Sequence, residues 1–374
     1  MVYFSARQTH LNSESFTQSA FWKQDVLALF FMSSSNSTPA SSQMPPQVQM
    51  IQMLTGFWLS QCIYVAAKLN LADLLEDGSC SCDSLAEQTG THSNSLYRLL
   101  RALASINIFA ETEPKCFKLT PLATCLRSDV PHSIKSFALL IGGDGYQMWS
   151  NLVHSIETGT EAYTRQHGMP LFAYHQQNPQ AAEIFNNAMT TLSALEQAAI
   201  VEAYDFTGIK KLVDVAGGCG SQLAAILQAY PQMQGMLIDQ PDVITSALDF
   251  LTQQEVSDRT QLIPGDFFEE VPPGGDTYLL KHIIHDWEDT EALKILQNCY
   301  KAMPEGGRLL IIEQIIPPGN QPSPAKFWDL TMLIVCGGKE RTAQEYRQLL
   351  ETANFELNRI ISTKSDASII EAIK

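Results

Sequence analysis

Apolar residues recur at helical spacing through the first half of the chain. From Val48 to Lys68 an apolar side chain returns every three or four positions, and the pattern continues to a stop at Gly78. Residues 81–104 predict a short helix, a turn and a second helix with leucines on one face, and a small hairpin follows around Pro114. Residues 132–200 return to helical spacing. This half of the chain therefore predicts helices with one hairpin.

The pattern changes after Thr207, where short apolar runs alternate with helical segments. Five runs are typical of strands: residues 210–218, 235–240, 260–268, 276–284 and 307–316. Repeated β–α units of this length predict a parallel sheet with helices on both faces. Residues 355–374 add two strands joined by a polar turn, which we expect to pair antiparallel at one edge. The expected fold class is α/β.

Composition suggests where these segments divide. Residues 33–47 are rich in serine, proline and glutamine and bury too little apolar surface to offset ordering, so residues 1–46 are expected to be a disordered tail. We expect an N-terminal domain over residues 47–131, a helical connector over residues 132–194 and an α/β domain over residues 195–374.

Bulk composition narrows the class of protein. The chain has 374 residues, 45% hydrophobic and 17% charged, which suits one large or two ordinary domains with real cores. Its formal net charge of −16 repels phosphate backbones and anionic membranes, so we expect neither a nucleic acid nor a membrane as partner. The eight cysteines are scattered without zinc-site spacing, and the apolar run Val26–Met32 is too short to span a bilayer. A cytoplasmic location is expected.

The N-terminal domain has the element order of a winged helix. Such a module either binds DNA or serves as a scaffold for dimerisation. The helix that would read DNA carries only Arg98 and Arg101 as cations, whereas DNA-reading helices present a basic face. We therefore favour a dimerisation module.

A glycine-rich turn follows the first strand of the sheet. Gly217, Gly218 and Gly220 stand where that strand gives way to a helix, and glycines there let backbone N–H groups approach a ligand closely. The dinucleotide fingerprint G-x-G-x-x-G fails at Leu223, which disfavours an NAD-dependent dehydrogenase.

Acidic residues follow the next two strands. Asp239 ends the second strand, and Asp266 and Phe267 follow the third. Ligands of such sheets bind at the carboxyl ends of the strands, where a carboxylate accepts the ribose hydroxyls. We expect an adenosine, with Asp239 on the ribose, Asp266 on the exocyclic amine and Phe267 against the ring.

Seven motifs occur in an order that resembles one known family. They are LVDVAGGCG, IDQPDVI, GDFF, LKHIIHDWED, AMPEGG, IIEQIIP and GGKERT. From about Gln47 to its end, the chain resembles S-adenosylmethionine-dependent small-molecule O-methyltransferases of the caffeic-acid, flavonoid and hydroxyindole type, whose bacterial members act on natural products. The combination of HDW and GGKERT is specific, whereas the glycine loop alone fits any class I methyltransferase.

The resemblance implies a fold, a cofactor and a partner. Residues 195–374 would form the Rossmann-like sheet of a class I methyltransferase, and an all-α, winged-helix-like domain would hold a homodimer. S-adenosylmethionine would be the cofactor, with the glycine loop around its methionine part and Lys281 beside its adenine. Ala216 replaces a family glycine, and it fits the turn if its φ is negative. No metal is implied.

His285 matches the general base of that family, and its chemistry fits the role. A hydroxyl attacks a sulfonium methyl as it loses its proton, and an imidazole titrates near neutrality. Glu313 and Glu340 match the two acids that flank this base, where a carboxylate fixes the imidazole tautomer. His282 is interpreted as structural, and Asp289 as the N-cap of the next helix.

The expected function is methyl transfer from S-adenosylmethionine to a hydroxyl of a small aromatic or polyketide-like metabolite. Five side chains are candidates for the acceptor pocket: Trp149, Phe185, Met189, Trp328 and Met332. Two alternatives stay open. One is a cofactor-binding relative with hydroxylase-like or decarboxylase-like chemistry, which the retention of His285 and both glutamates disfavours; the other is a non-enzymatic regulator that uses the winged helix on DNA.

Overall fold

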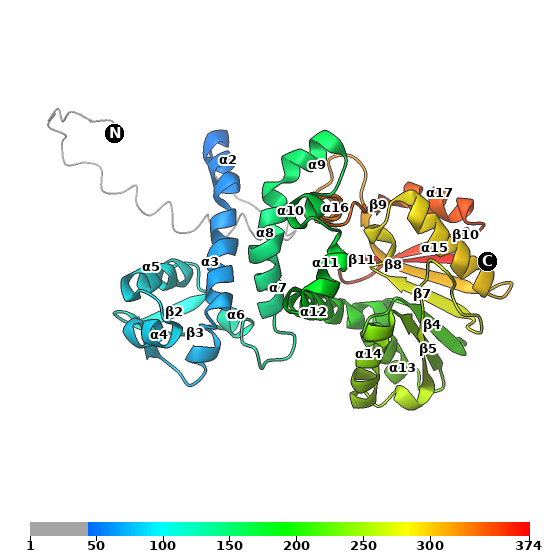
Figure 1. Ribbon diagram of the computed structural model, residues 1–374, viewed down its shortest axis with the longest axis horizontal. Coiled ribbons are helices and arrows are strands. Elements are labelled where there is room, and N and C mark those ends of the chain that lie inside the picture. Colours follow the sequence, from blue (N-terminus) through cyan, green and yellow to red (C-terminus); the bar gives the residue numbers. More distant parts are fainter. Residues whose placement is uncertain (1–43) are drawn as a thin grey trace, which may run out of the picture. The chain divides into compact units, whose positions relative to one another are not determined.

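The computed structural model describes residues 44–374, so the expected tail lies almost wholly outside the described residues. An eight-stranded sheet dominates the C-terminal part (Figure 1). Its strands are β4 (Lys211–Val215), β5 (Gln234–Asp239), β6 (Thr260–Pro264), β7 (Thr277–Lys281), β8 (Arg308–Ile316), β9 (Arg341–Thr342), β10 (Glu356–Ser362) and β11 (Ala367–Ile373). The order is β10-β11-β8-β7-β4-β5-β6, and β9 pairs with β8.

Strand directions agree with the expectation from the sequence. Neighbours among β4, β5, β6, β7 and β8 are parallel, whereas β11 is antiparallel to both β8 and β10. The predicted parallel sheet and its antiparallel edge pair are therefore confirmed. Parallel neighbours bring the carboxyl ends of β4, β5, β6 and β7 to one edge.

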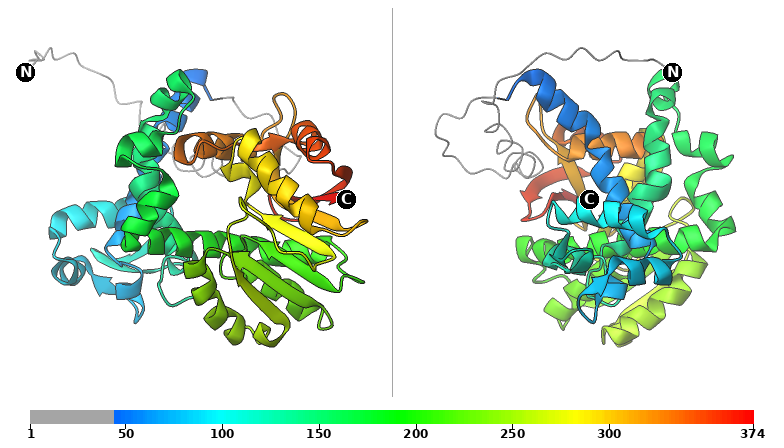
Figure 2. Two further views of the ribbon diagram at one scale, coloured as in Figure 1. Left: turned by 45° about the vertical axis from the view of Figure 1, so that its right-hand side comes forward. Right: turned by 90° about the vertical axis from the view of Figure 1, so that its left-hand side faces the viewer.

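Helices cover both faces of this sheet (Figure 2). Helices α15 (Asp289–Ala302) and α17 (Ala343–Thr352) pack on one face, and α13 (Ser221–Ala229) and α14 (Pro241–Gln253) pack on the other. Successive side chains of β4 enter the two cores in turn: Leu212 enters one, and Val213 and Val215 enter the other. Burial on both faces explains why these strands are continuous apolar runs in the sequence.

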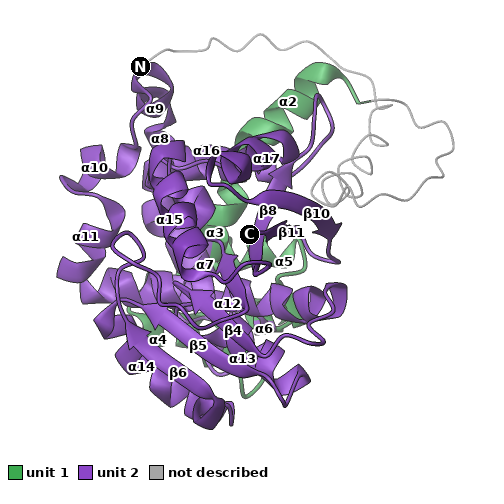
Figure 3. Cartoon of the chain, turned by 90° about the vertical axis from the view of Figure 1, so that its right-hand side faces the viewer, with its two compact units in different colours: residues 1–63, 74–123 green, residues 64–73, 124–374 purple. Residues whose placement is uncertain are grey.

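The described chain divides into two compact units, coloured separately in Figure 3. One comprises the described residues up to 63 together with 74–123, and the other comprises 64–73 and 124–374. Helix α12 (Pro179–Ala203) runs without a break across the expected boundary at residue 195. The domain boundaries drawn from the sequence stay predictions.

The smaller unit consists mainly of helices. Its elements include α2 (Pro46–Thr55), most of α3 (Phe57–Lys68), α4 (Cys82–Thr89), α5 (Ser93–Ala104), β1 (Cys80–Ser81), β2 (Phe109–Glu113) and β3 (Cys116–Leu119). The hairpin expected around Pro114 is confirmed as β2 and β3, and β1 joins it as a third antiparallel strand. Leu96, Leu100 and Leu103 form the buried face of α5.

Helices α2 and α3 leave large apolar side chains in solvent. The strongly exposed ones are Met50, Ile51, Met53, Leu54, Phe57 and Trp58. The stretch Pro46–Lys68 is also long and apolar enough to cross a membrane by length and composition alone. Exposed apolar side chains gathered on one surface are typical of interaction surfaces.

The larger unit also contains several shorter helices, most of them before β4 in the chain and one after β8. They are α7 (Lys135–Leu140), a π-turn η3 (Ile141–Gly145), α8 (Tyr146–Ser150), α9 (Leu152–Thr158), α10 (Ala162–His167), α11 (Leu171–Gln177) and α16 (Ala325–Val335). Gly159 and Gly168 end α9 and α10 in the left-handed conformation that glycine tolerates. Helix α16 packs against α8, α9 and α10.

Candidate active site

The turn after β7 carries the central histidine. The sequence predicted a strand as far as Ile284, but β7 ends at Lys281, and residues 284–286 form a single 3₁₀ turn, η5. Glu313 explains the difference. Its Oε1 accepts hydrogen bonds from the backbone N–H groups of Ile283, Ile284 and His285 at 3.1, 3.0 and 3.3 Å. The carboxylate thus takes the place of a neighbouring strand as acceptor.

His285, Glu313 and Glu340 meet in this turn, although their positions in the chain are far apart. Nδ1 of His285 lies 2.9 Å from Oε1 of Glu340 and 3.1 Å from Oε2 of Glu313. Nε2 points away from both glutamates and is 3.6 Å from Oδ1 of Asp286. A ring whose Nδ1 donates to a carboxylate keeps Nε2 as its acceptor nitrogen.

His285, Glu313 and Glu340 shift one another's pKa values. Burial disfavours the charged imidazole, but the carboxylates of Glu313 and Glu340 outweigh that effect and raise the pKa of His285 to about 10. Burial also works to raise the pKa of Glu313, yet the charges of His285 and His282 lower it overall. Burial raises the pKa of Glu340. Perturbed ionisable groups gathered at one place are typical of functional sites.

His282 belongs to the same cluster, which the sequence interpretation missed. Its ring stacks on His285, with centroids 5.3 Å apart, and its Nε2 is 2.8 Å from Oε2 of Glu196 on α12. Lys281 lies 3.3 Å from the same Glu196 oxygen. The spacing His-x-x-His at a strand end is the signal that could have suggested the pair. Within residues 44–374, a ring nitrogen of His282, a ring nitrogen of His285 and a carboxylate oxygen of Glu313 all lie within 4.8 Å of one another.

A buried arginine ties the turn to the loop that carries Glu340. The side chain of Arg341 has no exposed surface and donates to the carbonyl oxygens of Ile284 and Trp287 and to the carboxylate of Asp289. Asp289 is therefore not the N-cap of α15: Glu288 holds that position, and Asp289 is the first helical residue, where it binds Arg341. Arg341 was a further residue that the sequence interpretation missed.

The glycine loop lies at the carboxyl end of β4, as predicted. Gly218 and Gly220 have φ of 62° and 78°, which favour glycine. A side chain at Gly217 would collide with the carboxyl group of Asp214 and lie 2.6 Å from Leu237. Ala216 departs from the expectation, since its φ is 59° and not negative. The loop accommodates Ala216 in a strained conformation.

Asp239, Asp266 and Phe267 lie at the same edge of the sheet. Oδ2 of Asp239 accepts from the N–H of Gly218 at 2.8 Å, so this carboxylate reaches the glycine loop. Asp266 accepts from the N–H of Phe268 at 2.8 Å, and the ring of Phe267 meets Trp287 edge to face. The structure thus brings the predicted nucleoside residues together, while their roles stay predictions.

Asp214 shows that this edge suits a cationic ligand group. It is 1% exposed, its Oδ2 has no hydrogen-bond partner within the described chain, and burial raises its pKa to about 7. Lys281 is the nearest cation acting on it, but its ammonium donates to Ser193 at 2.7 Å. An orphaned buried carboxylate beside the glycine loop fits the ammonium group of a bound amino acid.

The five acceptor-pocket candidates fall into two groups. Trp149 of α8 and Phe185 of α12 pack against one apolar cluster, to which α16 contributes Ile334. Met189, Trp328 and Met332 lie on α12 and α16 but outside that cluster. Beside Phe185 stand further rings that the sequence did not single out: Tyr163, His167, Tyr174 and His175.

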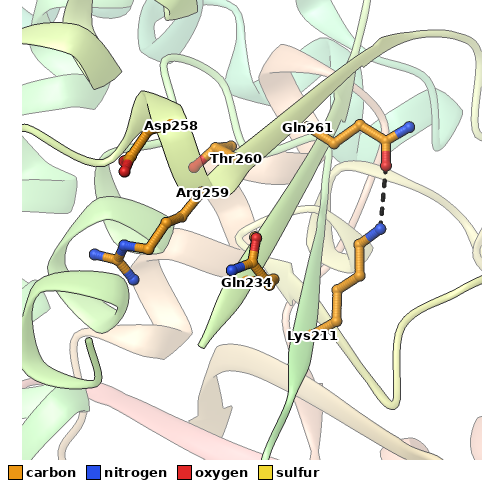
Figure 4. A pocket seen from close by; sticks show the side chains of 7 residues that line it. Lys211, Gln234, Asp258, Arg259, Thr260 and Gln261 are labelled. Atoms are coloured by element: carbon orange, nitrogen blue, oxygen red, sulfur yellow. Dashed lines mark hydrogen bonds between the residues drawn. The ribbon is translucent and has the colours of Figure 1, made fainter. Parts of the chain in front are cut away.

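An open hollow of about 260 Å³ lies elsewhere on the molecule (Figure 4). Lys211, Gln234 and Thr260 line it, and these residues begin β4, β5 and β6. It therefore lies at the amino ends of the strands, away from the residues described above, and we do not assign it to the site.

Comparison with known proteins identifies the family. The model of the O-methyltransferase domain matches residues 149–356, and that of the O-methyltransferase dimerisation domain matches residues 51–129. The chain belongs to the O-methyltransferase family. It is an S-adenosylmethionine-dependent O-methyltransferase with an N-terminal dimerisation domain, as the motifs implied.

Two curated relatives of this O-methyltransferase differ in the atom that they methylate. It is 42% identical to the phenazine O-methyltransferase PhzM of Lysobacter antibioticus, over 86% of this chain and 95% of that protein. It is 34% identical to the phenazine-1-carboxylate N-methyltransferase of Pseudomonas aeruginosa, over 87% and 96%. The family resemblance alone therefore does not fix the acceptor atom.

Solved structures agree with the fold. The crystal structure of LaPhzM has 41% sequence identity and a TM-score of 0.85, and the match covers 88% of this chain and 99% of that one. Human N-acetylserotonin methyltransferase, solved in complex with S-adenosylmethionine, has 25% identity and a TM-score of 0.81 over 90% and 99%. The α/β, class I methyltransferase fold expected from the sequence is confirmed.

Proposed function

We propose that this O-methyltransferase methylates a hydroxyl of a small aromatic natural product, with His285 as the general base. The orientation of the His285 ring carries the proposal. Because Nδ1 bonds to Glu340 and lies 3.1 Å from Glu313, Nε2 is the nitrogen left to accept a proton.

The chemistry needs few groups. S-adenosylmethionine supplies a methyl group bound to a positively charged sulfur. The acceptor hydroxyl gives its proton to Nε2 of His285 while its oxygen bonds to the methyl carbon and the carbon–sulfur bond breaks, which leaves S-adenosylhomocysteine. Glu313 and Glu340 stabilise the imidazolium that results. Correct alignment of oxygen and methyl supplies much of the remaining acceleration.

The edge of the sheet supplies groups suited to the cofactor. Asp239 would hold the ribose, Asp266 and Phe267 the adenine, and the glycine loop with Asp214 the amino-acid end. The hydrogen bond between Asp239 and Gly218 supports this assignment, because it brings the ribose residue and the glycine loop together. Lys281 is held by Ser193 and Glu196 within the same region.

The rings near Phe185 support a flat acceptor. Trp149 and Phe185 join one apolar cluster, and His175 lies against Phe185 with ring centroids 4.8 Å apart. Burial lowers the pKa of His175, which favours the neutral ring. Aromatic walls of this kind stack on planar rings. A phenazine or hydroxybenzoate skeleton fits this description.

Transfer to a ring nitrogen is the second candidate. The raised pKa of His285 favours this second candidate, because an imidazole that is protonated at pH 7 is a poor base. A ring nitrogen with a free lone pair attacks the methyl group without losing a proton first. His285→Ala separates the two candidates, since it should abolish transfer to a hydroxyl and leave transfer to a nitrogen.

Calorimetric titration with S-adenosylhomocysteine is the first test. Wild type and His285→Ala should bind it equally, because His285 is not assigned to the cofactor. Hydroxylated phenazines and hydroxybenzoates are then offered with S-adenosylmethionine, and products are identified by mass spectrometry. Failure of both proteins to bind would remove the proposal; methylated hydroxyls formed equally by the mutant would remove the role of His285.

The exposed apolar residues of α2 and α3 support a homodimer. The family's dimerisation domain begins at residue 51, so it includes most of this surface. A second copy of the chain would cover Ile51, Leu54 and Trp58 and explain an apolar stretch that membrane insertion would otherwise explain. Light scattering after size exclusion would reveal a monomer if this proposal were wrong.

A further inference from the structure

One carboxylate oxygen of Glu313 faces two imidazoles. Its Oε2 lies 3.1 Å from Nδ1 of His285 and 3.4 Å from Nδ1 of His282. The side chain of Glu313 is fully buried, so water does not compete for this oxygen. This oxygen accepts no hydrogen bond within the described residues, so the two rings interact with it through charge. Any charge that His282 carries therefore acts on the same carboxylate that faces His285.

We propose that His282 is a positioning residue, which competes with His285 for Glu313 and thereby controls how readily His285 releases its proton. The inference rests on the proposed role of His285 as the base. His282 itself touches neither the acceptor nor the cofactor in this account. It acts through its charge, both on Glu313 and on the neighbouring ring of His285.

Glu196 favours the charged form of His282. Nε2 of His282 is 2.8 Å from Oε2 of Glu196, so both ring nitrogens face carboxylates. Burial works against the charged ring, but the hydrogen bond to Glu196 and the charge of Glu313 outweigh it and raise the pKa of His282. A ring that faces two carboxylates is stable when both nitrogens carry protons.

The geometry fixes the direction of the effect. A cation whose ring centroid lies 5.3 Å from His285 disfavours a second positive charge there, and it also neutralises part of Glu313. The charged groups around His282 are Lys281 from β7, Glu196 from α12, Glu313 from β8, His285 and Asp286 from η5, and Glu340 from the loop before β9. Loss of His282 would leave Glu313 wholly to His285, which would then hold its proton more tightly.

His282→Gln tests this, with His132→Gln as the matched control. His132 is an exposed histidine with φ of 56°, close to the 54° of His282, so the control reproduces both the lost imidazole and the left-handed backbone. Histidine rings labelled with carbon-13 are titrated by NMR, and the signal missing from His285→Ala identifies His285. The rate of methyl transfer is measured over the same pH range.

The expected result is a higher pKa of His285 in the variant. In His282→Gln the titration of His285 should move up by about one pH unit, and the rate at pH 7 should fall about tenfold and recover at higher pH. His282→Arg keeps the positive charge and should restore the wild-type profile. His132→Gln should change neither quantity.

The outcomes separate the two proposals. An unchanged or lowered titration of His285 in folded His282→Gln overturns this inference; if that variant does not fold, His282→Asn gives the same test, because asparagine tolerates positive φ. The NMR titration needs no acceptor. A shifted titration without methyl transfer by the wild type would refute the proposed function alone, and transfer that depends on His285 without a shift would refute the role of His282 alone.

Discussion

Ala216→Gly should stabilise the protein, because Ala216 holds a backbone conformation that its side chain disfavours. Its φ is 59°, and its N–H donates to the carbonyl oxygen of Ile238 at 2.8 Å, which prevents the loop from relaxing. A left-handed conformation costs a residue with a Cβ about 1–2 kcal/mol. Glycine removes this cost but gives the unfolded chain about 0.4–1 kcal/mol more entropy to lose. The expected net gain is about 0.5–1 kcal/mol in the free energy of unfolding.

Thermal unfolding would detect a gain of that size. The midpoint of the larger unit should rise by about 1–4 °C. Ala198→Gly is the control, since Ala198 is exposed inside α12, where glycine costs about 1 kcal/mol and should lower the midpoint. A fall of the midpoint in Ala216→Gly, of the size seen in the control, would refute the reasoning about strain.

Three further predictions concern the site and the dimer. Gly338→Ala should cost more than about 2 kcal/mol and reduce methyl transfer severely, because its Cβ would collide with the carbonyl oxygen of His285; circular dichroism and activity assays would check this. Trp58→Asp should turn the proposed dimer into monomers in light scattering, because it places a charge among apolar side chains. The raised pKa of His285 predicts that kcat/KM rises with pH between about 7 and 10, as the neutral base accumulates. The stability that protonated His285 contributes is complete below its unfolded pKa and is lost as pH rises through about 10. A pH series of rates and of urea unfolding for wild type and His285→Gln would check both trends.

The sheet could be predicted because its pattern is local. Apolar runs such as the one before Asp239 alternate with helices, and that alternation restricts the strands to parallel neighbours. The end of β7 could not be predicted in the same way. His282, Ile283 and Ile284 continue the apolar run, and the pattern contains no sign that a carboxylate on β8 takes up the backbone N–H groups.

The site was predicted as far as its motifs reach. His285, Glu313 and Glu340 stand in motifs, and the structure brings them together. Glu196, by contrast, lies in a helix of ordinary composition, 86 positions from the histidine it binds. Its role depends on the packing of α12 against the sheet, which no local pattern specifies. At Ala216 the sequence showed that alanine replaces the family's glycine, but it could not show that the φ of this residue is positive.

Glu313 has two structural tasks at once. One oxygen of this carboxylate faces Nδ1 of His285, and the other accepts hydrogen bonds from three backbone N–H groups, so the turn depends on Glu313 whether or not a base is present. His285, by contrast, joins the turn through its backbone, whose N–H donates to Glu313 and whose carbonyl oxygen accepts from the N–H of Lys339, and its ring is the proposed base. Descendants of this scaffold are therefore free to exchange the histidine and acquire a different reaction, while the glutamate must be inherited.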